Sequence, residues 1–152
     1  MSTHRLTSTK RAALVIAALA AFCAVSPAFA AETVAVSLVG ERGGEMAIKL
    51  DHASMPAGTI TFHVLNSAMN TPHEMVLLKA NSADAKLDVD AKTNRVSEAA
   101  LPSEGEVSGL KAGQSGDLTV KLEPGNYVLI CNLKGHYAAG MHTSFTVTAA
   151  AG

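Results

Sequence analysis

The residues best suited to chemistry in this chain are a cysteine, a histidine and a methionine that lie within eleven consecutive positions. They are Cys131, His136 and Met141, spaced Cys-x4-His-x4-Met. Thiolate, imidazole and thioether groups are soft ligands that suit copper, and a Cys plus two His set with a weak axial Met forms a blue-copper centre. The run lacks only a second histidine, and we expect His73 to supply it.

Strand patterns on both sides of this run predict where its side chains point. Cys131 follows an apolar segment at 127–130, and Met141 begins an alternating segment that ends at residue 147. Because side chains alternate along a strand, both ligands fall on apolar faces, Cys131 with Tyr127 and Leu129, Met141 with Phe145 and Val147. Two adjacent strand ends are therefore predicted to carry a thiolate and a thioether inward, with His136 on the loop between them.

This pattern resembles the cupredoxin (type 1 blue-copper, plastocyanin-like) family. In that family the first histidine begins a middle strand, and the cysteine, second histidine and methionine surround one C-terminal loop. The ligand-loop spacing is most similar to that of the rusticyanin and sulfocyanin branch. The resemblance implies one type 1 copper ion bound by His73, Cys131, His136 and Met141.

Two further expectations concern the surroundings of these ligands. Many cupredoxins have an asparagine directly after the first histidine that braces the cysteine-bearing loop, whereas this chain has Glu74. Because ligands need such orienting partners, we expect Asn70 or Ser67 to take that role. Small uncharged residues surround His136 in its loop, so we expect its imidazole edge to reach solvent and redox partner proteins to dock transiently there.

The first 30 residues have the features of a secretory signal peptide. Basic residues precede an apolar stretch at 12–25, which is short for a membrane span, and Ala28-Phe29-Ala30 is a small-x-small cleavage pattern. We predict cleavage after Ala30, a periplasmic location and a copper-binding domain at 31–152. This domain would be a monomer without stable membrane insertion.

The composition of residues 31–152 limits the possible partners and compartments. These 122 residues include 9 basic and 13 acidic ones, a net charge of −4, which argues against nucleic acid as a partner. They contain one cysteine, Cys131. An unpaired thiol outside the cytoplasm needs protection from oxidation, and coordination to a metal would provide it.

Short segments with a single apolar face dominate the rest of the domain. Turn signals at 40–44, 56–58, 111–113 and 124–126 separate them. This pattern favours an all-β fold built as a two-sheet antiparallel β-sandwich, and the resemblance implies its Greek-key, cupredoxin-like version. The predicted inward residues are Val34, Val36, Leu38, Met46, Ile48, Leu50, Ile60, Phe62, Val64, Leu118, Val120 and Leu122.

Residues 81–109 interrupt this pattern, because they are polar and lack sustained alternation. Segments 82–86 and 95–100 could each form a turn or two of helix before Pro102. We therefore expect a short helical excursion between the two sheets, whose mixed charges form a solvated face.

The remaining histidines are weaker ligand candidates. Alternation places His63 and His142 on the outer faces of their sheets. His52, with Met46 and Met55 nearby in sequence, could join a second and weaker copper site. Polar residues are also normal at a strand end before a Pro-Gly turn, which is the simpler explanation of His52.

The sequence favours an electron carrier over two other classes of function, a copper-handling protein and an enzyme. The first of these alternatives is a periplasmic copper-binding protein for copper tolerance or delivery, which would also use the weaker copper site near His52. An oxidase or nitrite reductase needs a further copper centre, and multicopper oxidases place histidines on both sides of the ligand cysteine. Here Ile130 and Asn132 flank Cys131, so we predict that the protein is not an enzyme.

Overall fold

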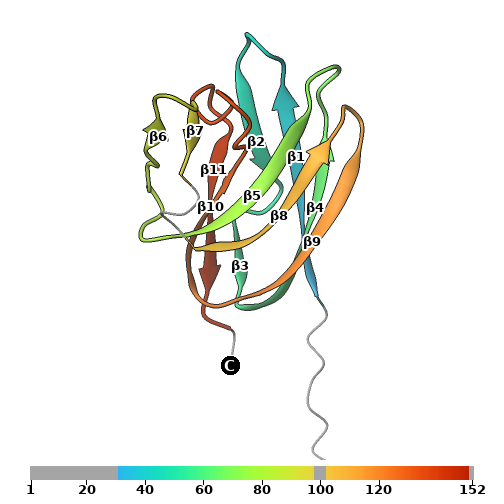
Figure 1. Cartoon of the computed structure of the whole chain (residues 1–152). Coiled ribbons are helices and arrows are strands. Elements are labelled where there is room, and N and C mark those ends of the chain that lie inside the picture. The colour runs from blue at the N-terminus through green and yellow to red at the C-terminus, as the bar shows by residue number, and fades with distance from the viewer. Residues whose placement is uncertain (1–30, 98–101, 151–152) are drawn as a thin grey trace, which may run out of the picture.

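The computed structural model describes residues 31–97 and 102–150, and the predicted signal peptide lies outside these residues. The described residues form two packed β-sheets and a small two-stranded sheet (Figure 1). None of their segments is a helix long and apolar enough to cross a membrane. The strands are β1 (Glu32–Gly40), β2 (Met46–Leu50), β3 (Ser54–Pro56), β4 (Gly58–Asn66), β5 (His73–Ala80), β6 (Val89–Asp90), β7 (Arg95–Val96), β8 (Ser103–Leu110), β9 (Ser115–Leu122), β10 (Gly125–Ile130) and β11 (His142–Thr148).

The two large sheets confirm the predicted Greek-key β-sandwich. The first sheet has the order β2-β1-β4-β9 and the second β3-β11-β10-β5-β8. Most neighbours are antiparallel, but β1 pairs with β4 and β11 with β3 in parallel. β2 pairs with one edge of β1, and β4 pairs with the other.

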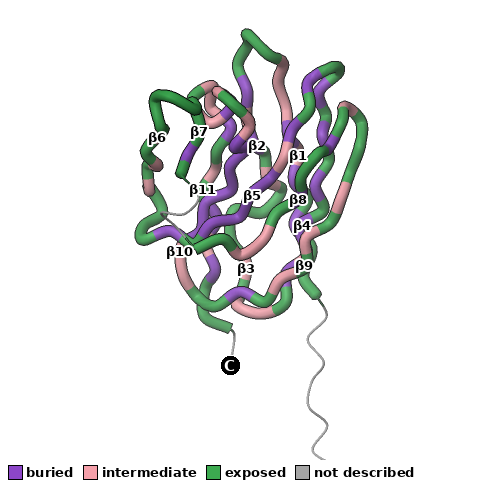
Figure 2. The backbone as a smooth tube through the Cα atoms, viewed as in Figure 1, coloured by how far each residue is buried: buried purple, intermediate pink, exposed green. Residues whose placement is uncertain are grey.

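The core lies between the two sheets, where the buried segments of the chain face one another (Figure 2). The predicted alternation in β1, β2 and β4 is confirmed, because Val34, Phe62 and Val64 are completely buried. Phe62 of β4 meets Phe145 of β11 edge to face across the core, at 5.2 Å between ring centroids. Complete burial of one such side chain stabilises the fold by about 1.5 to 3 kcal/mol.

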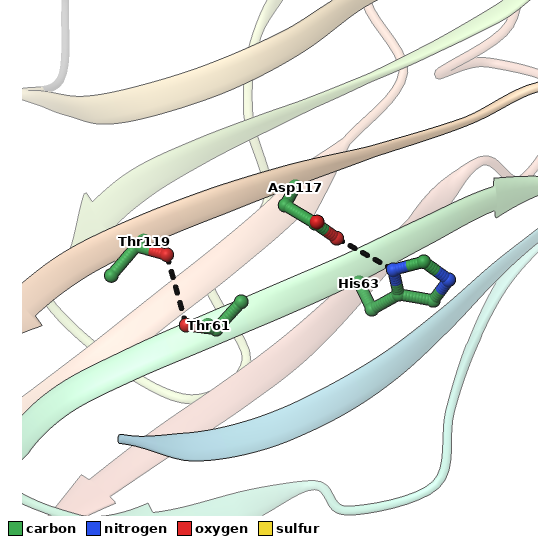
Figure 3. A network of polar contacts seen from close by, with 4 residues as sticks. All are labelled: Thr61, His63, Asp117 and Thr119. Atoms are coloured by element: carbon green, nitrogen blue, oxygen red, sulfur yellow. Dashed lines mark hydrogen bonds and ion pairs between the residues drawn. The ribbon is translucent and has the colours of Figure 1, made fainter. Parts of the chain in front are cut away.

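Two polar pairs between β4 and β9 lie on the outer face of the first sheet (Figure 3). The Nδ1 atom of His63 lies 2.5 Å from a carboxylate oxygen of Asp117, and the hydroxyls of Thr61 and Thr119 lie 2.9 Å apart. His63 therefore faces away from the core, as its alternation predicts.

The expectation of a helical excursion over 81–109 was wrong for the described residues. Ser103–Leu110 forms the edge strand β8 on β5, and Arg95–Val96 forms β7, which pairs with β6. Only Val107 and Leu110 of β8 are buried, and register shifts in the β5–β8 pairing break its alternation. This irregularity conceals the strand in the sequence, and residues 98–101 of the predicted second helix lie outside the described residues.

The segment 81–97 also packs more closely against the sheet than a solvated excursion would. Buried side chains on the outer face of β5 and β10, among them Val76 and Ile130, form a second apolar cluster with Val96, Leu87 and Val89. The charged residues of the segment remain exposed. One side of the segment thus covers the sheet while the other meets solvent.

Four connections gather at one end of the sandwich, seen at the top of Figure 1, and we call this the loop end. They are 41–45 after β1, 67–72 before β5, 111–114 after β8 and 131–141 after β10. The segment 81–97 lies beside the last of these connections, because β7 contacts it through hydrogen bonds.

Candidate metal centre

The four predicted ligands lie at the loop end, three of them at the ends of neighbouring strands of the second sheet and His136 on the loop between β10 and β11. His73 is the first residue of β5, Cys131 directly follows β10, and Met141 directly precedes β11. These ends meet because β10 pairs with both β5 and β11. The amide of Cys131 donates to the carbonyl of Met141 at 3.0 Å, so a backbone hydrogen bond joins two of the predicted ligands.

Three potential ligand atoms converge on one buried point. The Nδ1 atoms of His73 and His136 are 3.2 Å apart, and the sulfur of Cys131 lies 4.0 and 3.3 Å from them, respectively. His73 and Cys131 are completely buried, and His136 is only 3% exposed. Metal bonds of about 2.0 to 2.3 Å place trigonal ligand atoms roughly 3.5 Å apart, so this spacing accommodates one ion.

The orientation of His73 is set by its other ring nitrogen. Its Nε2 lies 3.1 Å from the carbonyl oxygen of Gly40, which can only accept a hydrogen bond, so Nε2 carries the proton and donates. In the neutral ring Nδ1 then keeps its lone pair for a metal. A backbone carbonyl that holds a ligand histidine in this way is a common feature of metal sites.

The electrostatics of the pocket favour neutral ligands before a metal binds. Burial raises the pKa of the Cys131 thiol to about 11, although the amides of Glu74 and Leu133 bond to the sulfur and oppose the rise. Burial, and then the neighbouring charges of His73 and Arg42, lower the pKa of His136 to about 4. At neutral pH the imidazole of His136 is thus ready to bind, whereas Cys131 must release a proton to bind as thiolate.

Met141 lies next to this cluster and is completely buried. Its amide donates to the carbonyl of His136 at 3.0 Å, which closes the loop between two ligands. Its burial in the core beside Phe145 and Val147 confirms the predicted facing. Its role as the axial ligand stays a prediction.

The ligand loop is braced by Asn132, a residue to which the sequence analysis gave no bracing role. The side chain of Asn132 accepts from the amide of Val96 at 2.7 Å and donates to its carbonyl at 2.9 Å. The amide of Gly135 donates to the carbonyl of Asn94 at 2.8 Å, and the hydroxyl of Tyr137 accepts from an amide at Leu87. The segment 81–97 is therefore the brace of the loop that carries His136.

The two predicted braces make other contacts. The hydroxyl of Ser67 lies 2.7 Å from that of Ser37, and the amide of Asn70 donates to Glu41. Neither residue therefore braces the cysteine-bearing loop through these contacts. The asparagine that braces the loop directly follows the cysteine, whereas the sequence analysis looked for it near the first histidine.

A second set of contacts fixes the chain that leads into His73. The amide of the buried Asn66 side chain donates to the carbonyls of Thr71 and Leu110, both at 3.0 Å. Glu41 accepts from the hydroxyl of Thr71 at 2.6 Å and from the amide of Met69. These two bonds, the Thr71 bond first, lower the pKa of Glu41 below 4.5.

Gly140 is required where the ligand loop crosses β2. Its φ of +102° is unfavourable for other residues, and a Cβ atom there would lie 2.8 Å from the carbonyl oxygen of Met46. The amide of Met46 also donates to the carbonyl of Ala139. The loop can therefore approach β2 this closely only because the side chain is absent.

Comparison with known proteins identifies the family. A family model described as the Sulfocyanin (SoxE) domain matches residues 17–151. The chain belongs to this family. This confirms the predicted resemblance to cupredoxins of the rusticyanin and sulfocyanin branch.

Individual relatives agree with this assignment. Auracyanin-B of Chloroflexus aurantiacus is 31% identical over 104 residues, which cover 62% of this chain and 44% of auracyanin-B, so the match spans less than half of that relative. An auracyanin structure from Roseiflexus castenholzii is 24% identical with a TM-score of 0.54, covering 78% of this chain and 98% of that one. Rusticyanin from Thiobacillus ferrooxidans is 16% identical with a TM-score of 0.54, covering 76% and 75%. These structural likenesses show the fold.

In this sulfocyanin-domain protein the surroundings of His136 differ from the expected uncharged, open edge. His136 is only 3% exposed, and it lines a surface depression that Arg42 and Lys134 also line. Sequence reasoning missed Arg42 because it belongs to the distant connection 41–45. The two segments approach through the hydrogen bond between Met46 and Ala139.

The other histidines of the described residues do not join the cluster of His73, Cys131 and His136. The exposed His142 stacks on Tyr137 with centroids 4.7 Å apart, as expected of an outward residue. His52 pairs with Asp51 at 3.2 Å. Met46 begins β2 at the loop end, whereas His52 and Met55 follow the other end of that strand, so the second copper site is not assembled from these three residues.

Proposed function

We propose that this protein is an exported, periplasmic carrier of single electrons with one type 1 copper ion bound by His73, Cys131, His136 and Met141. The observation that carries the proposal is the convergence of two imidazole Nδ1 atoms and one thiol sulfur at a buried point. When bound, copper supplies a one-electron couple at such a ligand set.

The protein's own contribution is to hold the ligands still. The carbonyl of Gly40 fixes the ring of His73, and Asn132 fixes the loop that carries His136. Cys131 and Met141 are joined by a backbone bond at their strand ends. Because the ligands are packed and hydrogen-bonded, little has to rearrange when the charge of the site changes, and this favours fast electron transfer.

The burial of the ligands also supports a carrier over an enzyme. Among the described residues of the site, His73 and Cys131 are completely buried and His136 nearly so. A substrate could not reach the centre directly, whereas an electron can pass through a covering side chain. Export and cleavage after Ala30 rest on the pattern of the first 30 residues.

Copper loading of the purified protein tests this proposal. The oxidised copper form should show an intense thiolate-to-copper band in the visible, with an electron-resonance spectrum of a type 1 site. Cys131→Ser should remove the band, because the thiolate donates the charge, and His142→Ala should keep it as the matched histidine control. A colourless copper form of the wild type, or a coloured Cys131→Ser variant, would refute the proposal.

Stoichiometry separates the carrier from a copper-handling protein. The carrier binds one copper ion tightly and reversibly exchanges one electron per chain. Two or more exchangeable ions per chain would favour copper tolerance or delivery instead. Metal analysis after dialysis, combined with a redox titration, measures both quantities.

A further inference from the structure

The surface above His136 carries two cations, one from the ligand loop and one from a distant connection that the loop sequence does not reveal. A depression of about 370 Å³ opens there, and its lining includes Arg42, Lys134, Gly135, Ala139 and the edge of His136. Arg42 and Lys134 are both exposed. We call these two residues the cationic rim.

The two cations of the rim come from separate elements, because Arg42 belongs to the connection 41–45 and Lys134 to the ligand loop 131–141. Both line the same depression above His136.

The acidic groups of the adjacent elements do not cancel this charge within the depression, whose lining contains no carboxylate. The carboxylate of Glu41 is turned to the connection 67–72, where it bonds to Met69 and Thr71. The carboxylate of Asp90 accepts three hydrogen bonds within its own turn, from Lys92 and Thr93. Glu45, on the connection 41–45, is exposed and does not line the depression.

We propose that the cationic rim docks a one-electron redox protein whose cofactor edge is surrounded by carboxylates. The inference rests on the proposed function, since it names the class of partner for the same centre. The transfer needs no bond change and no proton: one chain loses an electron and its partner gains it. Residues 31–152 carry a net charge of −4, so the local charge at the rim is opposite to the overall charge.

This opposition gives a direct kinetic test with small reagents. The reduced copper protein is oxidised with hexacyanoferrate(III), a trianion that becomes hexacyanoferrate(II), and in parallel with the cation tris(1,10-phenanthroline)cobalt(III). At ionic strengths of about 0.1 to 0.5 M, screening lengths are about 10 Å or less, so local charge decides the salt dependence. We expect the rate with the anion to fall as salt rises. A rate with the anion that rises with salt would show that overall charge dominates, and would overturn the proposal.

Charge-reversal variants locate the effect. Arg42→Glu and Lys134→Glu should each slow oxidation by the anion by about three- to tenfold and accelerate oxidation by the cation. Lys121→Glu is the control, because it makes the same charge change at the end of β9 that lies away from the loop end. It should change the rate with either reagent less than about twofold. Loss of a nearby cation also makes the site easier to oxidise, which would accelerate both reagents. Opposite responses to the two reagents therefore identify docking, and equal responses in all three variants would refute it.

A polymer probe extends the test to a protein-sized acidic partner. Poly-L-glutamate should inhibit oxidation of the wild type by the anion, and should lose this effect in the Arg42→Glu/Lys134→Glu double variant. The visible band of each variant confirms that its centre is intact. Absence of the band in the wild type would refute the proposed function. If the centre is intact and redox-active but poly-L-glutamate does not change its oxidation rate, only the docking proposal is refuted.

Discussion

The brace between Asn132 and Val96 provides the sharpest test of how the ligand loop is held. The Asn132 side chain is buried beside Cys131 and makes both hydrogen bonds that the Val96 backbone offers, at 2.7 and 2.9 Å. Asn132→Ala removes both partners at once. Val96 is only 6% exposed, so water cannot replace the lost bonds without opening the segment.

The expected loss of stability follows from this geometry. A buried backbone group left without a partner costs about 1 to 3 kcal/mol, and two such groups give an expected loss of about 2 to 6 kcal/mol in the free energy of unfolding. Urea unfolding should be measured on the copper-free protein, because bound metal stabilises the fold by mass action. Far-UV circular dichroism is the suitable signal, since the chain has no tryptophan.

Two further variants make the measurement decisive. Asn132→Asp keeps an acceptor for the Val96 amide but sets a carboxylate oxygen against the Val96 carbonyl, so it should destabilise at least as much as Asn132→Ala. The exposed Asn81→Ala serves as the control and should stay within about 0.5 kcal/mol of the wild type. If Asn132→Ala also stays within that range, the segment 81–97 does not brace the loop.

Three other substitutions probe the remaining parts of the site. Met141→Gln should lower the reduction potential while keeping a coloured centre, because a harder axial oxygen favours copper(II); voltammetry that shows no shift would assign Met141 to packing alone. Gly140→Ala should reduce the free energy of unfolding by about 1 to 3 kcal/mol through backbone strain, and the exposed Ala138→Gly offers a comparison in the same loop. Glu41 has a pKa lowered from 4.5, so its contribution to stability is present above that pH and is lost as pH falls through the lowered pKa. Glu41→Gln should therefore be less stable than the wild type at pH 7, and urea unfolding should show the difference shrinking below pH 4.5.

Local sequence patterns were sufficient to predict the sandwich and the strand-end positions of Cys131 and Met141. Alternation in β1, β2 and β4 identifies their buried faces without any knowledge of partners. Cys131 and Met141 lie at strand ends whose facing is fixed by the residues beside them. The approach of candidate ligands that lie at strand ends can therefore be predicted from the sequence.

The parts that sequence analysis missed depend on contacts between distant segments. Asn132 and Val96 are 36 residues apart, and nothing local marks either one as a partner of the other. Arg42 reaches the depression over His136 because the connection 41–45 folds across the loop end. The pattern of β8 was obscured by bulges in its pairing with β5, which remove the alternation that reveals other strands.

The two histidines are consequently held by different parts of the molecule. His73 begins a strand that pairs on both sides and is oriented by Gly40 of the opposite sheet. His136 lies on a loop whose side contacts come from the segment 81–97, through Asn94, Val96 and Leu87. Substitutions in that segment should therefore alter the geometry at His136 while leaving His73 in place. Because His136 also lines the depression above the centre, the segment 81–97 links the stability of the site to the surface through which we propose that electrons pass.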